Sequence, residues 1–287
     1  MTARVYDQFV EVLYLNKPPA RVFDQFVEIL MTNNIDKQYP LYLVRSTGPN
    51  STYVPPYETD PFWNNVSLYL SMNGDNGSTT IQEYTGKTIT NVNGVTLTDQ
   101  SSKFSGTSAY FNGSNYLEIT NTGDDFIFSK NFTIEFWINH NMTSQSDNEY
   151  KPGIMSLDRA GLTDTSLNRA WSINTATFDR TEFEFNYLTS LTRTFTQPYP
   201  KNTWDHIAFV RNGSNLTTYL NGIAKTAASV SYSSNLIGLY GRTLRIGYNK
   251  DTDDYFTGYL SEIRITKDLA RYTSNFTPPT TRFWTPT

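Results

Sequence analysis

Two glutamates in the segment TEFEFNYL are the first candidates for chemistry in this sequence. Glu182 and Glu184 are two residues apart, so a strand would place both carboxylates on one face of a sheet. Paired carboxylates hydrolyse glycosidic bonds, and enzymes that retain configuration hold them about 5 to 5.5 Å apart. Two acids on one strand face are also common on the solvent side of an edge strand. Hydrolysis is therefore the least favoured function.

Nucleophilic and metal chemistry have few side chains to draw on. The chain has no cysteine, and His140 and His206 are its only histidines. Disulfide bonds and thiolate metal sites are therefore excluded. The sequence also offers no recognisable Ser/His/Asp triad or zinc site. We therefore expect a protein that is not an enzyme.

Aromatic side chains are the most abundant candidates for binding, with 20 Tyr and 18 Phe in the chain. Four tyrosines near predicted strand ends or loops would stack on pyranose rings if exposed: Tyr187, Tyr248, Tyr255 and Tyr259. Trp137, Trp171 and Trp204 alternate with polar neighbours, which predicts that they fill the core between two sheets. The sequence does not show whether the four tyrosines share one surface.

Charge and hydropathy narrow the class of partner. The formal net charge is -4, the isoelectric point is near 5.3, and no long run of Lys or Arg is present. Nucleic acid is therefore not an expected partner. No apolar stretch approaches the roughly 18 residues that span a bilayer, and the start MTARVYDQFVEV does not resemble a signal peptide. We expect a soluble chain without membrane insertion.

The first 45 residues carry an internal repeat. ARVYDQFVEVL at 3–13 and ARVFDQFVEIL at 20–30 are identical at nine of eleven positions and are joined by a Pro-Pro segment. The spacing of apolar residues fits a helix or a strand, and the Val, Tyr and Phe content favours two strands. Such an arm offers edges for pairing with neighbouring subunits, or it forms a hairpin packed on its own domain. Its predicted contact residues are Val5, Phe9, Val12, Val22, Phe26 and Ile29.

The remaining chain reads as a proline-bearing linker at 46–61 and one β-rich domain at 62–287. Beyond Phe62, short alternating runs are broken every eight to twelve residues by Gly, Asn and Asp, which is typical of a two-sheet sandwich. Asn212-Gly213 and Asn221-Gly222 supply the positive φ of tight hairpin turns around a strand. The predicted strands are 66–70, 109–111, 116–119, 132–138, 153–157, 171–173, 182–187, 206–211, 216–220, 244–247 and 258–266.

The order of five segments in this domain resembles a known family. SAYFNGSNYLEI, FTIEFWI, TWDHIAFVRNGSNLTTYLNG, LRIGY and FTGYLSEIRIT are similar to the laminin-G-like branch of the concanavalin A-like lectin/glucanase superfamily, over about 62–279. The fold implied is an all-β, antiparallel jelly-roll sandwich. The flanking segments DPFWNNVSLYLSMNGDNGSTT and EIRITKDLARYTSNFTPPT resemble the laminin-G-like domains of tailed-phage virion proteins.

The resemblance also implies site residues. Many laminin-G-like domains hold one calcium ion through loop carboxylates, and Asp251, Asp253 and Asp254 in DTDD would supply such oxygens. Asp124 and Asp125 are an alternative, and solvated loop charge is the simpler explanation of both. The three-acid motif of the superfamily's glucanases is missing around Glu182, and His206 falls at a position that the family fills for packing.

These observations favour a non-enzymatic phage virion protein on the particle surface. Its arm would dock onto other virion proteins or copies of itself, and its lectin-like domain would project outward. Capsid decoration is the preferred version, because the chain is short for a fibre and lacks coiled-coil heptads. The alternative is a tail-associated adhesin that binds a host-surface glycan, and a glycoside hydrolase ranks third.

Overall fold

Two antiparallel sheets form the domain in the computed structural model. The model describes residues 60–120, 123–140, 152–159, 169–177, 180–187, 191–196, 202–225, 241–250 and 252–283. Of residues 159, 169, 175–177, 180–187, 191–196 and 241–242, only the backbone is described. The predicted arm and nearly all of the predicted linker lie outside these ranges. Phe62–Phe283 form one compact unit.

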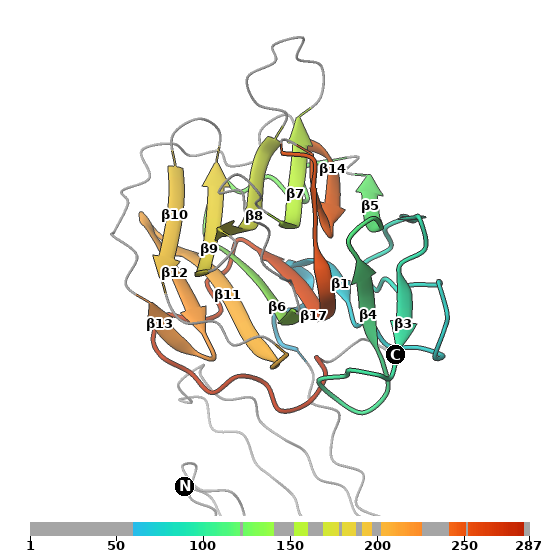
Figure 1. The fold of residues 1–287 in the computed structure, drawn as a ribbon. Coiled ribbons are helices and arrows are strands. Elements are labelled where there is room, and N and C mark those ends of the chain that lie inside the picture. Colours follow the sequence, from blue (N-terminus) through green and yellow to red (C-terminus); the bar gives the residue numbers. More distant parts are fainter. Residues whose placement is uncertain are drawn as a thin grey trace, which may run out of the picture. The chain divides into compact units, whose positions relative to one another are not determined.

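The first sheet has eight strands, and every pairing in it is antiparallel. Along it run β13 (Ile223–Lys225), β12 (Asn215–Leu220), β11 (Asp205–Asn212), β6 (Phe132–His140), β17 (Thr257–Lys267), β4 (Ser108–Asn112) and β3 (Thr96–Thr98). β1 (Val66–Leu70) pairs with the second half of β17, beyond the part that pairs with β4. The last strand, β17, therefore lies inside this sheet and pairs with the first strand, β1 (Figure 1).

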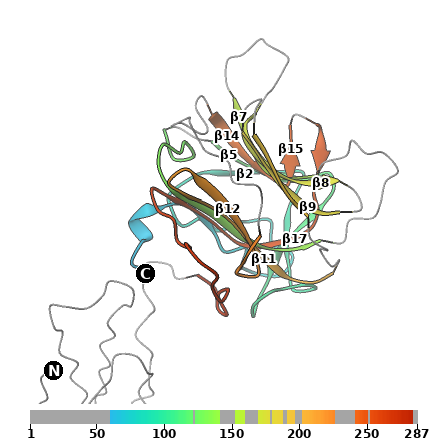
Figure 2. The same ribbon diagram turned by 90° about the vertical axis from the view of Figure 1, so that its left-hand side faces the viewer.

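The second sheet has seven strands and faces the first (Figure 2). Its order is β10 (Leu191–Thr196), β9 (Arg180–Tyr187), β8 (Arg169–Thr177), β7 (Gly153–Arg159), β14 (Gly241–Ile246), β5 (Tyr116–Thr120) and β2 (Ile89–Val92). A short hairpin, β15 (Tyr248–Asn249) with β16 (Asp254–Tyr255), is separate from both. The predicted all-β antiparallel sandwich is confirmed. The described residues contain only one short 3-10 helix, η1 (Trp63–Asn65), and no helix that could cross a membrane.

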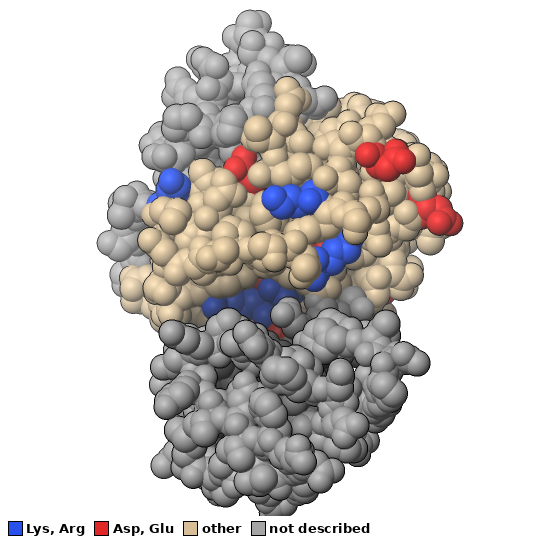
Figure 3. Space-filling view, turned by 90° about the horizontal axis from the view of Figure 1, so that it is seen from below, with Lys and Arg blue, Asp and Glu red and all other residues tan. Residues whose placement is uncertain are grey.

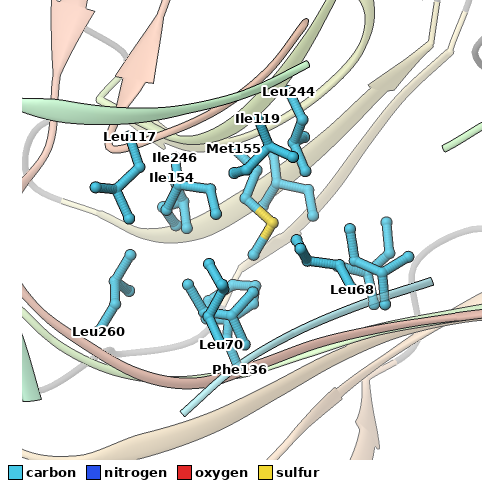
Figure 4. Close-up of a cluster of buried hydrophobic side chains, with 14 of the residues drawn as sticks. Leu68, Leu70, Leu117, Ile119, Phe136, Ile154, Met155, Leu244, Ile246 and Leu260 are labelled. Carbon is cyan, nitrogen blue, oxygen red and sulfur yellow. The ribbon is translucent and has the colours of Figure 1, made fainter. Parts of the chain in front are cut away.

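Apolar residues from the two facing sheets form the core (Figure 4). They alternate with polar residues along each strand because successive side chains point to opposite faces. Leu68, Leu70, Phe136 and Leu260 of the eight-stranded sheet meet Leu117, Ile119, Ile154, Met155, Leu244 and Ile246 of the seven-stranded sheet, and all are fully buried. Trp171 is in this core as predicted, and its indole nitrogen donates to the Phe126 carbonyl at 3.0 Å.

The other two predicted core tryptophans are elsewhere. Trp137 is buried on the outer side of the eight-stranded sheet, because its strand neighbours Phe136 and Ile138 take the inward positions. The Lys103 ammonium lies 3.8 Å from the centre of its ring and helps to cover it. Trp204 precedes β11 and is only partly buried. Alternation with polar neighbours indicates that a tryptophan and its neighbours lie on opposite faces of the sheet. It does not show which of the two faces is turned toward the core.

The hairpin turns around β12 follow the Asn-Gly prediction. Gly213 has φ 62°, Asn221 φ 51° and Gly222 φ 76°. These left-handed conformations are the ones that Gly and Asn adopt at low cost. They allow β11, β12 and β13 to form a meander at one edge of the eight-stranded sheet.

The C-terminal strap, residues 268–283, crosses the outer face of the eight-stranded sheet. Figure 2 shows it as the red segment on the side away from the seven-stranded sheet. The Asn275 side chain accepts from the Ala224 amide at 2.9 Å, and the Phe276 amide donates to the Gly222 carbonyl at 2.9 Å. The strap therefore occupies one backbone group of edge strand β13 and one of the turn before it, which would otherwise be open to pairing with another chain.

The two ends of the described unit meet on this same outer face. The Tyr69 ring contacts Trp63 near the start and Phe283 at the end, at centroid distances of 6.1 and 5.8 Å. The buried carboxylate of Glu262 accepts from the Tyr69 hydroxyl at 2.6 Å and from the Phe283 amide at 2.8 Å. The chain thus enters and leaves the unit on the strap side.

Candidate functional site

The outer face of the seven-stranded sheet is polar at its centre. In β5, β14, β7 and β8 the inward residues are apolar, so alternation turns Glu118, Arg245, Ser156 and Ser172 outward. The strand register places these four side by side: Glu118 pairs with Arg245, Arg245 with Ser156, and Ser156 with Ser172. Ser156 and Ser172 have no exposed surface, so this row of four polar residues underlies the candidate site and only Glu118 and Arg245 are in part accessible.

One guanidinium organises the charges in this row. Arg245 Nη2 lies 2.8 Å from Glu118 Oε1, and Arg245 Nη1 forms an ion pair with Asp158 Oδ2. The Lys250 ammonium lies 3.8 Å from the same Asp158 oxygen. Both cations are therefore engaged by carboxylates. Arg245 also stands between Glu118 and Asp158, in the space that a glycosidic bond between two catalytic acids would need.

The β15–β16 hairpin packs against the same outer face, beside the row. Asn249 Nδ2 donates to Asn174 Oδ1 at 3.2 Å, and the Ser156 hydroxyl donates to the Tyr248 carbonyl at 3.2 Å. The close approach depends on Gly153 at the start of β7, since a Cβ there would overlap the backbone of Asn249. The hairpin is thus fixed to the sheet by buried polar contacts.

Three tyrosines cluster where the hairpin meets β5. The rings of Tyr116 and Tyr248 are stacked at 4.9 Å, those of Tyr248 and Tyr255 are 4.5 Å apart, and those of Tyr116 and Tyr255 are 6.1 Å apart. All three side chains are only partly buried. We call them the tyrosine cluster.

The Tyr248 hydroxyl is held by an acid of the hairpin. It donates to Asp253 Oδ1 at 2.8 Å. Burial, this hydrogen bond and the negative charge of Asp253 together raise the pKa of Tyr248 well above its ordinary value. The phenol therefore stays protonated at physiological pH and remains a donor. Asp253 itself is exposed and has the left-handed φ of 58°.

The structure unites two of the four predicted glycan contacts. Tyr248 and Tyr255 lie in the tyrosine cluster, whereas Tyr259 lies on the other sheet, where its ring is 5.2 Å from that of Tyr110. The backbone of Tyr187 pairs with Trp171 in the seven-stranded sheet, and its side chain is outside the described part. Sequence reasoning missed Tyr116, although its alternation with Leu117 and Ile119 was a usable signal.

Glu182 and Glu184, the candidate acids of the least favoured function, lie in β9. Glu182 pairs with Thr196 of β10, and Glu184 pairs with Thr194. β9 is the second strand from the edge of the sheet, so it is not the edge strand that the sequence suggested. Nothing is described of the two side chains.

The predicted calcium ligands are described only in part. Asp253 is exposed, Asp254 is buried in the hairpin, and Asp251 lies outside the described residues. In the part of the chain that the structure describes, no three His, Asp or Glu side chains come together as metal ligands. Calcium binding by DTDD therefore stays a prediction.

The alternative acids, Asp124 and Asp125, each pair with a lysine. Asp124 Oδ2 lies 2.7 Å from Lys267 Nζ, and Asp125 Oδ2 lies 3.3 Å from Lys87 Nζ. Lys267 lowers the pKa of Asp124 through a hydrogen bond and its charge. These contacts account for both carboxylates without a metal ion.

Both histidines are buried in the eight-stranded sheet. His206 has no exposed surface, in keeping with the packing role that the resemblance implies, and its Nε2 atom lies 3.2 Å from Glu135 Oε2. His140 is buried at the end of β6. The two residues lie in the sheet opposite to the tyrosine cluster.

Comparison with known proteins agrees with this fold. Residues 111–270, more than half of the chain, match a laminin-G family model described as the concanavalin A-like lectin/glucanases superfamily. No curated protein matches the chain.

Solved structures that are similar share low sequence identity with this chain. One is botulinum neurotoxin type C, with 16% identity and a TM-score of 0.50 over 72% of this chain and 49% of that one. Another is a receptor binding domain, with 16% identity and a TM-score of 0.50 over 73% and 50%. A third is domain 4 of the arabinanase AbnA from Geobacillus stearothermophilus, with 16% identity and a TM-score of 0.46 over 71% and 92%.

The match to the first two structures covers about half of their length, and at such identity it shows a shared fold alone. The family model covers β4 to β17, which includes the polar row and the hairpin. The protein belongs to the concanavalin A-like lectin/glucanases superfamily, with a domain of the laminin-G type.

Proposed function

We propose that this protein is a non-enzymatic glycan-binding module displayed on a phage virion, with the tyrosine cluster as its sugar-binding surface. The observation that carries the proposal is the grouping of Tyr116, Tyr248 and Tyr255, partly exposed, beside a row of polar side chains. Sugars present both an apolar C–H face and hydroxyl groups. A surface that combines aromatic rings with fixed hydrogen-bonding groups suits both.

The hairpin contacts support the proposal because they fix the rings before a ligand arrives. Tyr248 is held through its hydroxyl on Asp253, through its carbonyl on Ser156 and between two other rings. A side chain that is already ordered loses little conformational entropy on binding. Preorganised rings of this kind give more affinity per contact than rings that must first be ordered.

The positions of the two chain ends also support a binding surface that is accessible to a ligand. The chain enters at Phe62 and leaves at Phe283 on the outer face of the eight-stranded sheet, while the tyrosine cluster lies on the outer face of the seven-stranded sheet. Both ends of the unit therefore lie on the face opposite to the cluster, so the chain connections at Phe62 and Phe283 leave the cluster clear.

The virion setting rests on the sequence. The duplicated motif at 3–13 and 20–30 and the phage-like segments that flank the domain support an arm that docks onto other virion proteins or copies of this chain. Capsid decoration remains the preferred site of attachment, with a tail adhesin as the alternative. Botulinum neurotoxin type C, which has this fold, enters cells by interacting with two ganglioside molecules, so the fold is compatible with glycan recognition at a cell surface.

The absence of catalysis is part of the proposal. The polar row and its neighbour Asp158 offer two acids, and Arg245 forms an ion pair with each and stands between them. A glycosidase needs one protonated acid and one free carboxylate that face the same bond. A screen of polysaccharides with the purified protein would overturn this part if any glycan were cleaved and if Glu182→Gln abolished the cleavage.

Binding is best tested with a glycan array followed by calorimetry on the full chain. Tyr255→Ala should weaken the affinity for the bound glycan by about tenfold or more, because it removes one of the three rings of the surface. Tyr110→Ala is the matched control, since it removes a partly buried ring from an aromatic pair on the other sheet. Tyr187→Ala and Tyr259→Ala test the two remaining predicted contacts. Equal affinity of wild type and Tyr255→Ala, with both variants folded, would refute the assignment of the site.

Attachment is a separate test. Electron cryo-microscopy of the particle that carries this chain would show its density on the icosahedral shell if decoration is correct. Density at the tail tip would replace decoration by the adhesin model and would leave glycan binding intact.

A further inference from the structure

We infer that the tyrosine cluster selects uncharged glycans and rejects acidic ones. This inference rests on the proposed function and concerns the charges that surround the cluster. Among the described side chains near the cluster, Glu118 and Asp158 share the Arg245 guanidinium, Lys250 lies near Asp158, and exposed Asp253 makes no ion pair. An exposed negative charge therefore lies beside the rings before any ligand binds.

Both described cations already face carboxylates of the chain. Arg245 is held between Glu118 and Asp158, and its side chain is mostly buried. The Lys250 ammonium is 3.8 Å from Asp158. A carboxylate or sulfate on a glycan would have to compete with Asp158 for Lys250, or with Glu118 and Asp158 for Arg245. On the face seen in Figure 3, groups of Lys and Arg and groups of Asp and Glu are both scattered among uncharged residues.

Asp253 is the acid nearest to the rings. Its carboxylate accepts from the Tyr248 hydroxyl and is exposed, and among the described residues it makes no ion pair. Sugar hydroxyls can donate to its remaining lone pairs, so an uncharged glycan gains hydrogen bonds there. An anionic glycan on the same rings meets a like charge instead. At a separation of about 8 Å, with an effective dielectric constant between about 20 and 80, one such repulsion weakens binding by about two- to thirtyfold.

The direct test changes only this charge. Asp253→Asn keeps an oxygen that accepts from Tyr248, and Asn tolerates the left-handed φ of 58° at this position. Asp75→Asn is the matched control, because Asp75 is an exposed aspartate elsewhere on the domain and its loss alters the net charge equally. The probes are gluco-, galacto- and manno-oligosaccharides, each paired with its uronic acid counterpart, on an array and then by calorimetry with the full chain.

We expect the wild-type protein to bind at least one uncharged oligosaccharide more tightly than its acidic counterpart. Asp253→Asn should narrow that difference by about two- to thirtyfold, and Asp75→Asn should leave it unchanged. In the wild type, raising the ionic strength from about 0.05 M to about 0.5 M should also reduce the difference in affinity between uncharged and acidic oligosaccharides, because salt screens repulsion between exposed charges.

The failures of the inference and of the proposed function are distinguishable. If acidic oligosaccharides bind as tightly as uncharged ones and Tyr255→Ala abolishes both, the tyrosine cluster is a glycan site and the charge selection is wrong. If no oligosaccharide binds, or if binding ignores Tyr255→Ala, the proposed site is wrong and the inference falls with it.

Discussion

Arg264 donates from both Nε and Nη2 to one oxygen of Glu135, at 2.9 and 2.8 Å, in the middle of the eight-stranded sheet. The other oxygen of Glu135 accepts from the Tyr272 hydroxyl at 2.7 Å and lies 3.2 Å from His206 Nε2. Glu135, Arg264 and His206 belong to three adjacent strands, and Tyr272 belongs to the strap. One fully buried carboxylate therefore ties the strap to the sheet.

Removal of this carboxylate should destabilise the fold strongly. Glu135→Ala leaves the buried guanidinium of Arg264 without its partner, and breaking a buried ion pair from one side costs about 3 to 5 kcal/mol. Glu118→Ala breaks an ion pair with Arg245 that is partly exposed, and it should cost about 1 kcal/mol or less. The free energy of unfolding of both variants, from urea titration, checks the difference. Similar losses in the two variants would contradict the role assigned to Glu135.

The same carboxylate should make the fold sensitive to acid. Burial tends to raise the pKa of Glu135, but the charges of Arg264, His206 and Arg271 and the hydrogen bond to His206 lower it below its ordinary value of 4.5. A carboxyl with a lower pKa in the folded state binds fewer protons there than in the unfolded chain. Its contribution to stability is therefore full above about pH 4.5 and is lost as the pH falls below that value.

Glu135→Gln should remove this part of the acid sensitivity. The variant is less stable than the wild type at pH 7, and the difference in the free energy of unfolding should shrink as the pH is lowered from about 5 to about 3. Urea titrations at several pH values measure it. A difference that stays constant over this range would mean that the pKa of Glu135 is not lowered.

Contact between the strap and the edge strand can be tested at a glycine. A Cβ at Gly222 would overlap the Phe276 carbonyl of the strap, whereas a Cβ at Gly213 has nothing within 4 Å. Both glycines have positive φ, so alanine costs about 1 to 2 kcal/mol at either position for the backbone alone.

Gly222→Ala should therefore lower the free energy of unfolding by about 1 to 3 kcal/mol more than Gly213→Ala does, because the added methyl group overpacks the contact with the strap. It should also speed hydrogen exchange at the Ala224 and Phe276 amides, which bond across this contact. Equal unfolding free energies and equal exchange in Gly222→Ala and Gly213→Ala would show that the strap does not depend on this contact.

Much of the sandwich could be predicted because local periodicity and turn chemistry agree with the tertiary fold. All eleven predicted runs are strands, and the Asn-Gly pairs around β12 form the expected turns. The strands that were missed include β2, β3, β15 and β16. They are short or irregular, and their pairing partners determine them more than their own sequence does.

The candidate site was only half predictable, for a topological reason. Tyr248, Tyr255 and Tyr259 lie within twelve residues of one another, but β17 carries Tyr259 into the other sheet. Tyr116 joins the cluster from more than 120 residues away, because β5 pairs with β14 just before the hairpin begins. Alternation assigns a residue to one face of its own strand. Only the order of strands in the sheet shows which faces meet.

Gly153 offers the sharpest test of the hairpin as a fixed support for the tyrosine cluster. A Cβ at this position would overlap the Asn249 backbone, whereas a Cβ at exposed Gly123 meets nothing within 4 Å, and neither glycine has a left-handed φ. Gly153→Ala should therefore shift the β15–β16 hairpin and cost about 1 to 3 kcal/mol of stability through overpacking. Gly123→Ala should leave both stability and binding unchanged.

Because the hairpin carries two rings of the cluster, Gly153→Ala should also weaken glycan affinity by about tenfold or more. Calorimetry with the glycan found on the array measures this loss. Hydrogen exchange at 248–255 reports the movement of the hairpin independently of any ligand. Faster exchange with unchanged affinity would separate the hairpin from glycan recognition and would place the sugar elsewhere on the sheet.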